Sequence, residues 1–121
     1  MATRSDDPRW GSLIDALRLM ASPPARQAAM LTELSEIAGQ IRRGEAPVEL
    51  IDVTLTREGV LPAEVGFLIQ RIDEIFDGLA FEDPAQAFTE AALAERSEWR
   101  LMRGLARGAL EQLGVPLPPM H

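Results

Sequence analysis

Apolar residues recur three and four positions apart through most of this sequence, and prolines and glycines divide the pattern into segments. That spacing places apolar side chains on one face of an α-helix. The pattern predicts helices over residues 8–21, 23–43, 62–78 and 84–113. An unbroken helix over the last segment would be about 45 Å long. A break near residues 95–97 is expected, because Glu95 interrupts its apolar face.

Local signals at the segment ends support these boundaries. A capping residue followed by proline is typical of a helix start. Glycine is typical of a helix end, where the backbone turns left-handed. The start pairs are Asp7-Pro8, Ser22-Pro23 and Asp83-Pro84; Pro62 also marks a start, and Gly44, Gly78 and Gly114 mark ends.

Residues 47–57 fit either a short helix or a strand, since their apolar positions suit both periods. A lone strand would have no other strand to pair with, so a short helix is expected. The sequence therefore predicts an all-α fold, a compact bundle of five to six amphipathic helices. Residues 1–114 are expected to form one domain, and residues 115–121 an extended, proline-rich C-terminal tail.

The composition excludes most catalytic chemistry. The chain has no cysteine and one histidine, His121, which removes thiolate chemistry, disulfides and multi-histidine metal sites. No phosphate-binding glycine loop, nucleophile elbow or zinc motif is present. Carboxylate pairs such as Asp73/Asp77 and Glu33/Glu36 remain, but such pairs are ordinary on solvated helices. We therefore expect no catalytic, cofactor-binding or metal-binding residues, and a protein that is not an enzyme.

No signal-peptide pattern and no apolar run long enough to span a bilayer is present, so the expected location is the cytoplasm, without membrane association. All twelve basic residues are arginine, and lysine, asparagine, tyrosine and cysteine are absent. This bias is typical of a high-GC genome, such as that of a bacterium or phage. Selection for arginine contacts would give the same bias.

The charge is unevenly distributed along this acidic chain. The net charge is −7, which argues against general nucleic-acid binding and suits a basic partner protein. Residues 96–113 nevertheless carry a net charge of +2. Their arginines are spaced four, three and four positions apart, within about a 60° arc of a helix. These four residues, Arg96, Arg100, Arg103 and Arg107, are named here the arginine ridge.

Three roles are open for the arginine ridge. It could pair with the chain's own acids, such as Asp73, Glu74 and Asp77 of the 62–78 helix. It could dock an acidic or phosphorylated partner, or it could contact nucleic acid, which the acidic remainder of the chain would oppose.

Gly104 and Gly108 form a GxxxG pattern in the same segment. Outside a membrane this pattern indicates close approach of two helix backbones. The neighbouring helix could belong to the same chain or to a second copy, which would make a homodimer through the Gly104/Gly108 helix.

Phe67 lies almost opposite the apolar face of the 62–78 helix, with Glu64 and Glu74 on the same side. An outward phenylalanine beside carboxylates is typical of an interface hot spot. A central helix buried on both sides would produce the same pattern, and Gly66 would suit its tight packing.

These features favour a non-enzymatic protein-interaction module: a small acidic inhibitor, adaptor or accessory subunit of a basic partner, with Phe67, Glu74 and Asp77 at the contact. In size, acidity and helicity the chain resembles toxin-immunity proteins and phage or bacterial anti-nuclease proteins. That resemblance implies a basic enzyme or nuclease as partner and assigns no residue. The alternative is a regulator that contacts nucleic acid or an anionic ligand through the arginine ridge.

Overall fold

The computed structural model describes residues 8–45, 58–59 and 61–118, which form an all-helical fold. The described part of the chain contains seven helices rather than the expected five or six. They are α1 (Pro8–Ala21), α2 (Pro24–Ala28), α3 (Leu31–Arg42), α5 (Ala63–Ala80), α6 (Pro84–Ala87), α7 (Glu90–Glu95) and α8 (Ser97–Leu113). None of these helices is both long enough and apolar enough to cross a membrane.

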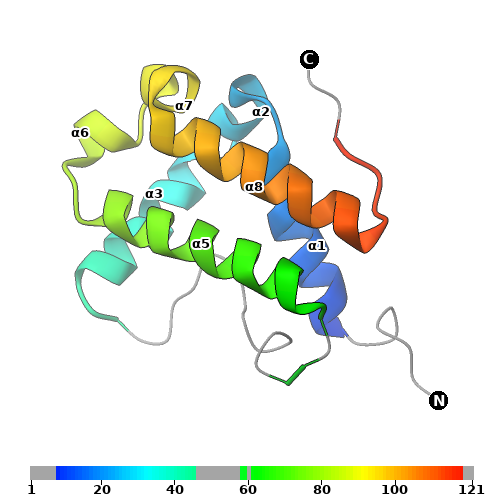
Figure 1. Ribbon diagram of the computed structural model, residues 1–121. Helices are drawn as coiled ribbons and strands as arrows, with labels where there is room; N and C mark the ends of the chain where they lie inside the picture. The colour runs from blue at the N-terminus through cyan, green and yellow to red at the C-terminus, as the bar shows by residue number, and fades with distance from the viewer. Residues whose placement is uncertain (1–7, 46–57, 60, 119–121) are drawn as a thin grey trace.

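The two longest helices, α5 and α8, lie side by side and run in opposite directions (Figure 1). Helices α1 and α3 pack behind them, α1 against α8 and α3 against α5. The short helices α2, α6 and α7 cover one end of the bundle, at the top of Figure 1. Each of the two helices keeps an outer face, where Phe67 of α5 and Leu101 of α8 are exposed.

Three aromatic rings form the centre of the core. Phe76 of α5, Phe88 at the end of α6 and Trp99 of α8 meet edge to face, with centroids 5.7 to 6.2 Å apart. Rings prefer this geometry because a positive edge meets a negative face. The buried indole Nε1 of Trp99 donates to the carbonyl oxygen of Ala87 at 2.9 Å, so its polar group is satisfied.

Several expected helix boundaries are confirmed. The side chain of Asp83 accepts a hydrogen bond from the backbone N–H of Ala85 at 2.9 Å and caps α6. Arg96, with extended backbone, separates α7 from α8 inside the expected break. Gly44 and Gly114 end α3 and α8 with φ of 71° and 72°.

Three boundaries differ from expectation. The segment expected at residues 23–43 is divided at Ala29 and Met30 into α2 and α3. A second division precedes α7, where Thr89 Oγ1 accepts from the N–H of Ala92 at 3.0 Å and caps a new helix. Gly78 lies inside α5 rather than at its end, since two further helical residues, Leu79 and Ala80, add buried apolar surface to the core.

Residues 115–118 have no regular secondary structure, and Val115 and Leu117 pack against the core. The expected cap at Asp7 and the expected helix over residues 47–57 lie outside the described residues.

Candidate functional site

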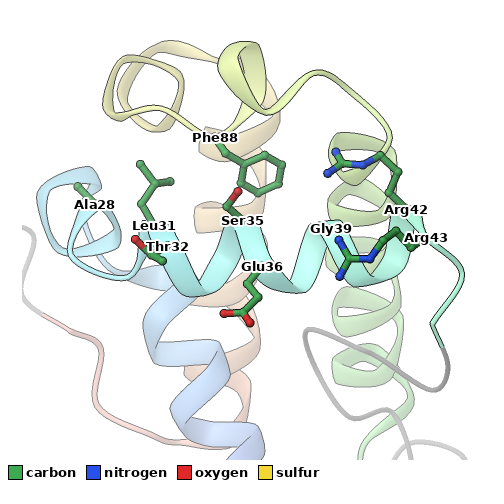
Figure 2. A pocket seen from close by; sticks show the side chains of 9 residues that line it. All are labelled: Ala28, Leu31, Thr32, Ser35, Glu36, Gly39, Arg42, Arg43 and Phe88. Atoms are coloured by element: carbon green, nitrogen blue, oxygen red, sulfur yellow. The ribbon is translucent and has the colours of Figure 1, made fainter.

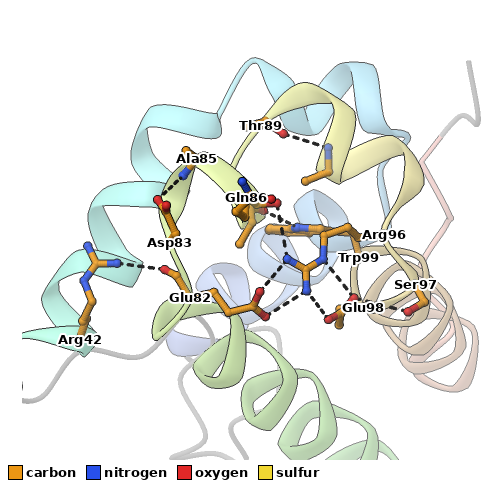
Figure 3. A network of polar contacts seen from close by, with 12 residues as sticks. Arg42, Glu82, Asp83, Ala85, Gln86, Thr89, Arg96, Ser97, Glu98 and Trp99 are labelled. Atoms are coloured by element: carbon orange, nitrogen blue, oxygen red, sulfur yellow. Dashed lines mark hydrogen bonds and ion pairs between the residues drawn. The ribbon is translucent and has the colours of Figure 1, made fainter.

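Arg96 connects the break between α7 and α8 to two carboxylates (Figure 3). Its Nη1 and Nη2 atoms lie 2.8 and 3.0 Å from the two carboxylate oxygens of Glu82. Its Nε and Nη2 atoms lie 3.3 and 2.6 Å from those of Glu98. Hydrogen bonds to Glu82 and then to Glu98 raise the pKa of the Arg96 guanidinium. The hydrogen bond from Arg96 is the largest cause that lowers the pKa of the Glu98 carboxyl.

Arg103 is the most deeply buried arginine of the ridge, with 8% of its surface exposed. Its Nη1 atom donates to Gln27 Oε1 at 3.0 Å and to the carbonyl oxygen of Leu93 at 2.7 Å. Burial is the main cause that lowers the pKa of this guanidinium, followed by the charge of Arg100. Arg103 therefore holds α2 and α7 against α8 through two neutral oxygens.

The other two arginines of the ridge also donate to carbonyl oxygens near helix ends. Arg100 Nη2 lies 3.0 Å from the carbonyl oxygen of Glu95, the last residue of α7. Arg107 Nη1 lies 3.4 Å from the carbonyl oxygens of Ala21, the last residue of α1, and of Pro118. The last carbonyls of a helix have no partner within it and carry partial negative charge, so cations are favourable there.

The C-terminus of α1 is capped by side chains at every free carbonyl. Each of its last four carbonyl oxygens accepts a hydrogen bond from a side chain outside the helix. Ser22 Oγ donates to Arg18 (2.6 Å), Gln27 Nε2 to Leu19 (3.3 Å) and Met20 (3.0 Å), and Arg107 Nη1 to Ala21 (3.4 Å). The sequence reasoning missed Gln27, because its role depends on helices that are distant in sequence.

Within the described residues the arginine ridge contacts its own chain, but only Arg96 is seen to pair with acids, as the first role required; Arg100, Arg103 and Arg107 donate to neutral oxygens. The carboxylates that Arg96 binds are Glu82 and Glu98, however, not the acids of α5. Arg103 is buried, Arg96 and Arg107 are half-buried, and Arg100 is exposed. The four arginines therefore do not present one continuous basic surface.

The outer face of α5 is the most conspicuous exposed apolar feature. Phe67 is 68% exposed, which places it on the outward side of α5. Phe81, immediately after the helix, is 65% exposed and lies 14 positions further along the chain. Glu74 and Asp77 are exposed on the same helix. A shallow hollow lined by Phe67, Gln70, Arg71 and Glu74 marks this face.

Phe81 was not among the expected site residues, because the helix was expected to end at Gly78. The four-three-four-three spacing of Phe67, Arg71, Glu74, Gly78 and Phe81 could have identified it.

The two glycines of the GxxxG pattern lie in different surroundings. A Cβ atom on Gly104 would meet nothing within 4 Å. On Gly108 it would meet Leu68 Cδ1 of α5 at 3.7 Å, an ordinary contact distance. Packing within the chain therefore requires neither glycine.

A larger hollow, of about 680 Å³, lies along α3 (Figure 2). At one end Arg43 pairs with Glu45, and Arg42 Nη1 donates to the carbonyl oxygen of Ala80 at 3.2 Å. Among the described residues of its lining, Glu36 is the only carboxylate, whereas carboxylate hydrolysis uses two. The lining residues are Ala28, Leu31, Thr32, Ser35, Glu36, Gly39, Arg42, Arg43 and Phe88.

The carboxylate pairs noted in the sequence lie on separate helices, Asp73/Asp77 on α5 and Glu33/Glu36 on α3. Within residues 8–45, 58–59 and 61–118, no group of three or more acidic or histidine side chains could hold a metal ion.

Comparison of the chain with protein-family models finds no matching family, and comparisons with curated proteins and with solved structures give no match either.

Proposed function

We propose that the protein is a non-enzymatic protein-interaction module that docks a basic partner protein on the outer face of α5. The observation that carries this proposal is the placement of Phe67 and Phe81, the two most exposed large apolar side chains among the described residues. Both belong to this face, one near each end of the helix. Aromatic side chains, phenylalanine among them, are enriched in protein interfaces relative to the rest of the surface.

The charge of α5 supports a basic partner. The helix carries Glu64, Asp73, Glu74 and Asp77 against one arginine, Arg71, a net charge of −3. An acidic surface steers a basic protein into contact and accelerates association. A basic enzyme or nuclease in the cytoplasm, held by a small acidic inhibitor, adaptor or accessory subunit, fits this surface.

The alternative function, contact with nucleic acid or an anionic ligand through the arginine ridge, receives less support. Arg96, Arg103 and Arg107 donate to oxygens of their own chain. A homodimer through α8 is supported only at Gly104, where the space above the backbone is open, since a Cβ atom on Gly108 would already meet Leu68 of the same chain.

The proposal is tested by capture of proteins from a lysate of the source organism on the immobilised full chain. Phe67→Ala should weaken binding of a specific basic protein about 30-fold or more, the effect of losing a hot spot of about 2 kcal/mol. Glu74→Arg should also weaken binding of this basic protein, and the loss should be largest at low salt. Both positions are exposed, so stability should change by less than about 0.5 kcal/mol.

Matched controls are Met30→Ala, which removes an exposed apolar side chain at the start of α3, and Glu33→Arg, which makes the same charge change on α3. Both controls should capture the same protein as the wild type. If Phe67→Ala and Glu74→Arg retain it as well as the controls do, the outer face of α5 is not the docking surface.

A further inference from the structure

The outer face of α5 carries a stripe at coiled-coil spacing. The six residues of this stripe, named here the α5 stripe, are Glu64, Phe67, Arg71, Glu74, Gly78 and Phe81, spaced three, four, three, four and three positions apart. All six are exposed. Such spacing keeps side chains on one seam of a helix, where a second helix can pack. The stripe therefore has the geometry of a helix-pairing surface.

The α5 stripe is complementary to itself when two copies run antiparallel. In one register Phe67 lies opposite Gly78 of the second copy, and Arg71 lies opposite Glu74. Twofold symmetry repeats each contact, since residue i meets j and j meets i. The same register sets Glu64 beside Phe81 and sets Leu68, which is half-buried, beside the half-buried Ile75. In this register each Phe67 ring faces the open space at Gly78 of the other copy, and each Arg71 faces a Glu74 of opposite charge.

Gly78 provides the space that the Phe67 ring requires. A Cβ atom built on Gly78 meets nothing within 4 Å, so no contact within the chain requires glycine there. Glycine is unfavourable inside a helix, and some packing gain is expected to offset it. A phenylalanine ring from a second copy, packed over the bare backbone, supplies that gain.

Arg71 and Glu74 provide the charge complementarity. Within one chain Arg71 Nη1 lies 3.5 Å from Glu74 Oε2, with both side chains more than half exposed. In the antiparallel pair each arginine also faces the carboxylate of the other copy, so four alternating charges meet at the symmetry axis.

Other arrangements of the same stripe are less favourable. A shift of one heptad in one direction sets Glu64 against Glu74, and a shift in the other direction moves Phe67 beyond the end of the opposing helix. Parallel pairing sets Arg71 against Arg71 and Glu74 against Glu74. Like charges that face each other oppose association, so one antiparallel register remains.

We propose that the α5 stripe pairs with the α5 stripe of a second copy of this chain, forming an antiparallel, twofold-symmetric dimer. The inference rests on the proposed function, because the same face then docks the basic partner and the two events exclude each other. One helix pair buries less than the roughly 1,200 Å² of a stable interface, so the dimer is weak and the partner can displace the second copy.

Sedimentation velocity of the full chain from about 1 µM to about 1 mM, a range that spans weak affinities, tests the proposal. The wild-type mass should rise from monomer to dimer. Arg71→Glu sets two pairs of like charges at the symmetry axis and should raise the Kd at least about tenfold, as should Glu74→Arg. The double variant Arg71→Glu/Glu74→Arg restores opposite charges and should dimerise within about threefold of the wild type. An equimolar mixture of the two single variants should also dimerise.

Gly78→Leu, which fills the space for the Phe67 ring, should abolish the dimer. The matched control is Gly104→Leu, at an equally open glycine of α8, and it should leave the dimer intact. A monomeric wild type at all concentrations would overturn the proposal. So would a dimer that Gly104→Leu disrupts and Gly78→Leu does not, since its interface would then lie on α8.

These results are independent of the capture experiment. A dimer with the expected variant pattern, together with capture that Phe67→Ala leaves unchanged, supports pairing and contradicts the proposed function. A chain that stays monomeric but loses its captured protein on Phe67→Ala contradicts pairing and supports the proposed function.

Discussion

Replacing Arg103 by methionine tests whether one buried guanidinium holds three helices together. The change leaves two acceptors without their donor, Gln27 Oε1 and the carbonyl oxygen of Leu93. Each unpaired buried acceptor costs about 1–3 kcal/mol. Removing a buried charge returns part of this cost, because the charge no longer has to leave water. Methionine fills much of the same volume, so the free energy of unfolding should fall by about 2–4 kcal/mol.

The matched control is Arg100→Met, which removes an arginine from the same helix. Arg100 is exposed and donates to the Glu95 carbonyl oxygen, which water can reach after the change. Its replacement should cost less than about 1 kcal/mol.

Urea unfolding at pH 7, followed by circular dichroism and by tryptophan fluorescence, gives the free energy of unfolding of both variants. The comparison requires that the dependence of this free energy on urea concentration is the same in wild type and variants. A loss below about 1 kcal/mol for Arg103→Met, or one no larger than that of Arg100→Met, would show that the buried network does not stabilise the fold.

Two further predictions concern Glu98 and two glycines, Gly104 within α8 and Gly114 at its C-cap. Because Arg96 lowers the pKa of Glu98, this carboxylate stabilises the fold above its unfolded pKa of about 4.3, and the stabilisation is lost as the pH falls through the lower folded pKa. Glu98→Gln should therefore lower the free energy of unfolding by up to about 1 kcal/mol at pH 7 and by progressively less below about pH 4. An equal loss at neutral and at acidic pH would contradict this. Gly104→Ala, with open space around its new Cβ atom, should raise the free energy of unfolding by about 0.5–1 kcal/mol. Gly114→Ala, at φ 72°, should lower it by about 1–2 kcal/mol, and the opposite order in urea unfolding would refute the argument.

The sequence predicted helix positions well where local signals agree. Asp83 followed by proline begins α6, and Gly114 ends α8, because capping and left-handed backbone are properties of a few adjacent residues. The divisions at Met30 and at Thr89 were missed because both segments continue an apolar helical pattern. Gln27 of α2 instead turns inward to the end of α1, a preference set by tertiary structure.

The candidate site was predictable to a similar extent. The outward position of Phe67 and the exposed Glu74 follow from helix periodicity, which says which side chains share a face. Periodicity cannot say what packs against that face. The arc of Arg96, Arg100, Arg103 and Arg107 is regular in sequence, yet its surroundings depend on where α1, α2 and α7 end.

The capping of α1 has a consequence for the order in which the chain acquires structure. Arg107 donates a hydrogen bond to the carbonyl oxygen of Ala21, 86 positions earlier in the chain, and Arg103 donates one to Gln27, 76 positions earlier. Because synthesis proceeds from the N-terminus, α1 is made before either of these donors. A nascent chain that stops before residue 103 therefore leaves the Ala21 carbonyl oxygen to water, whereas Ser22 and Gln27 are already present to cap the three carbonyls before it. The last carbonyl of α1 gains its side-chain donor only once α8 has formed and packed against α1.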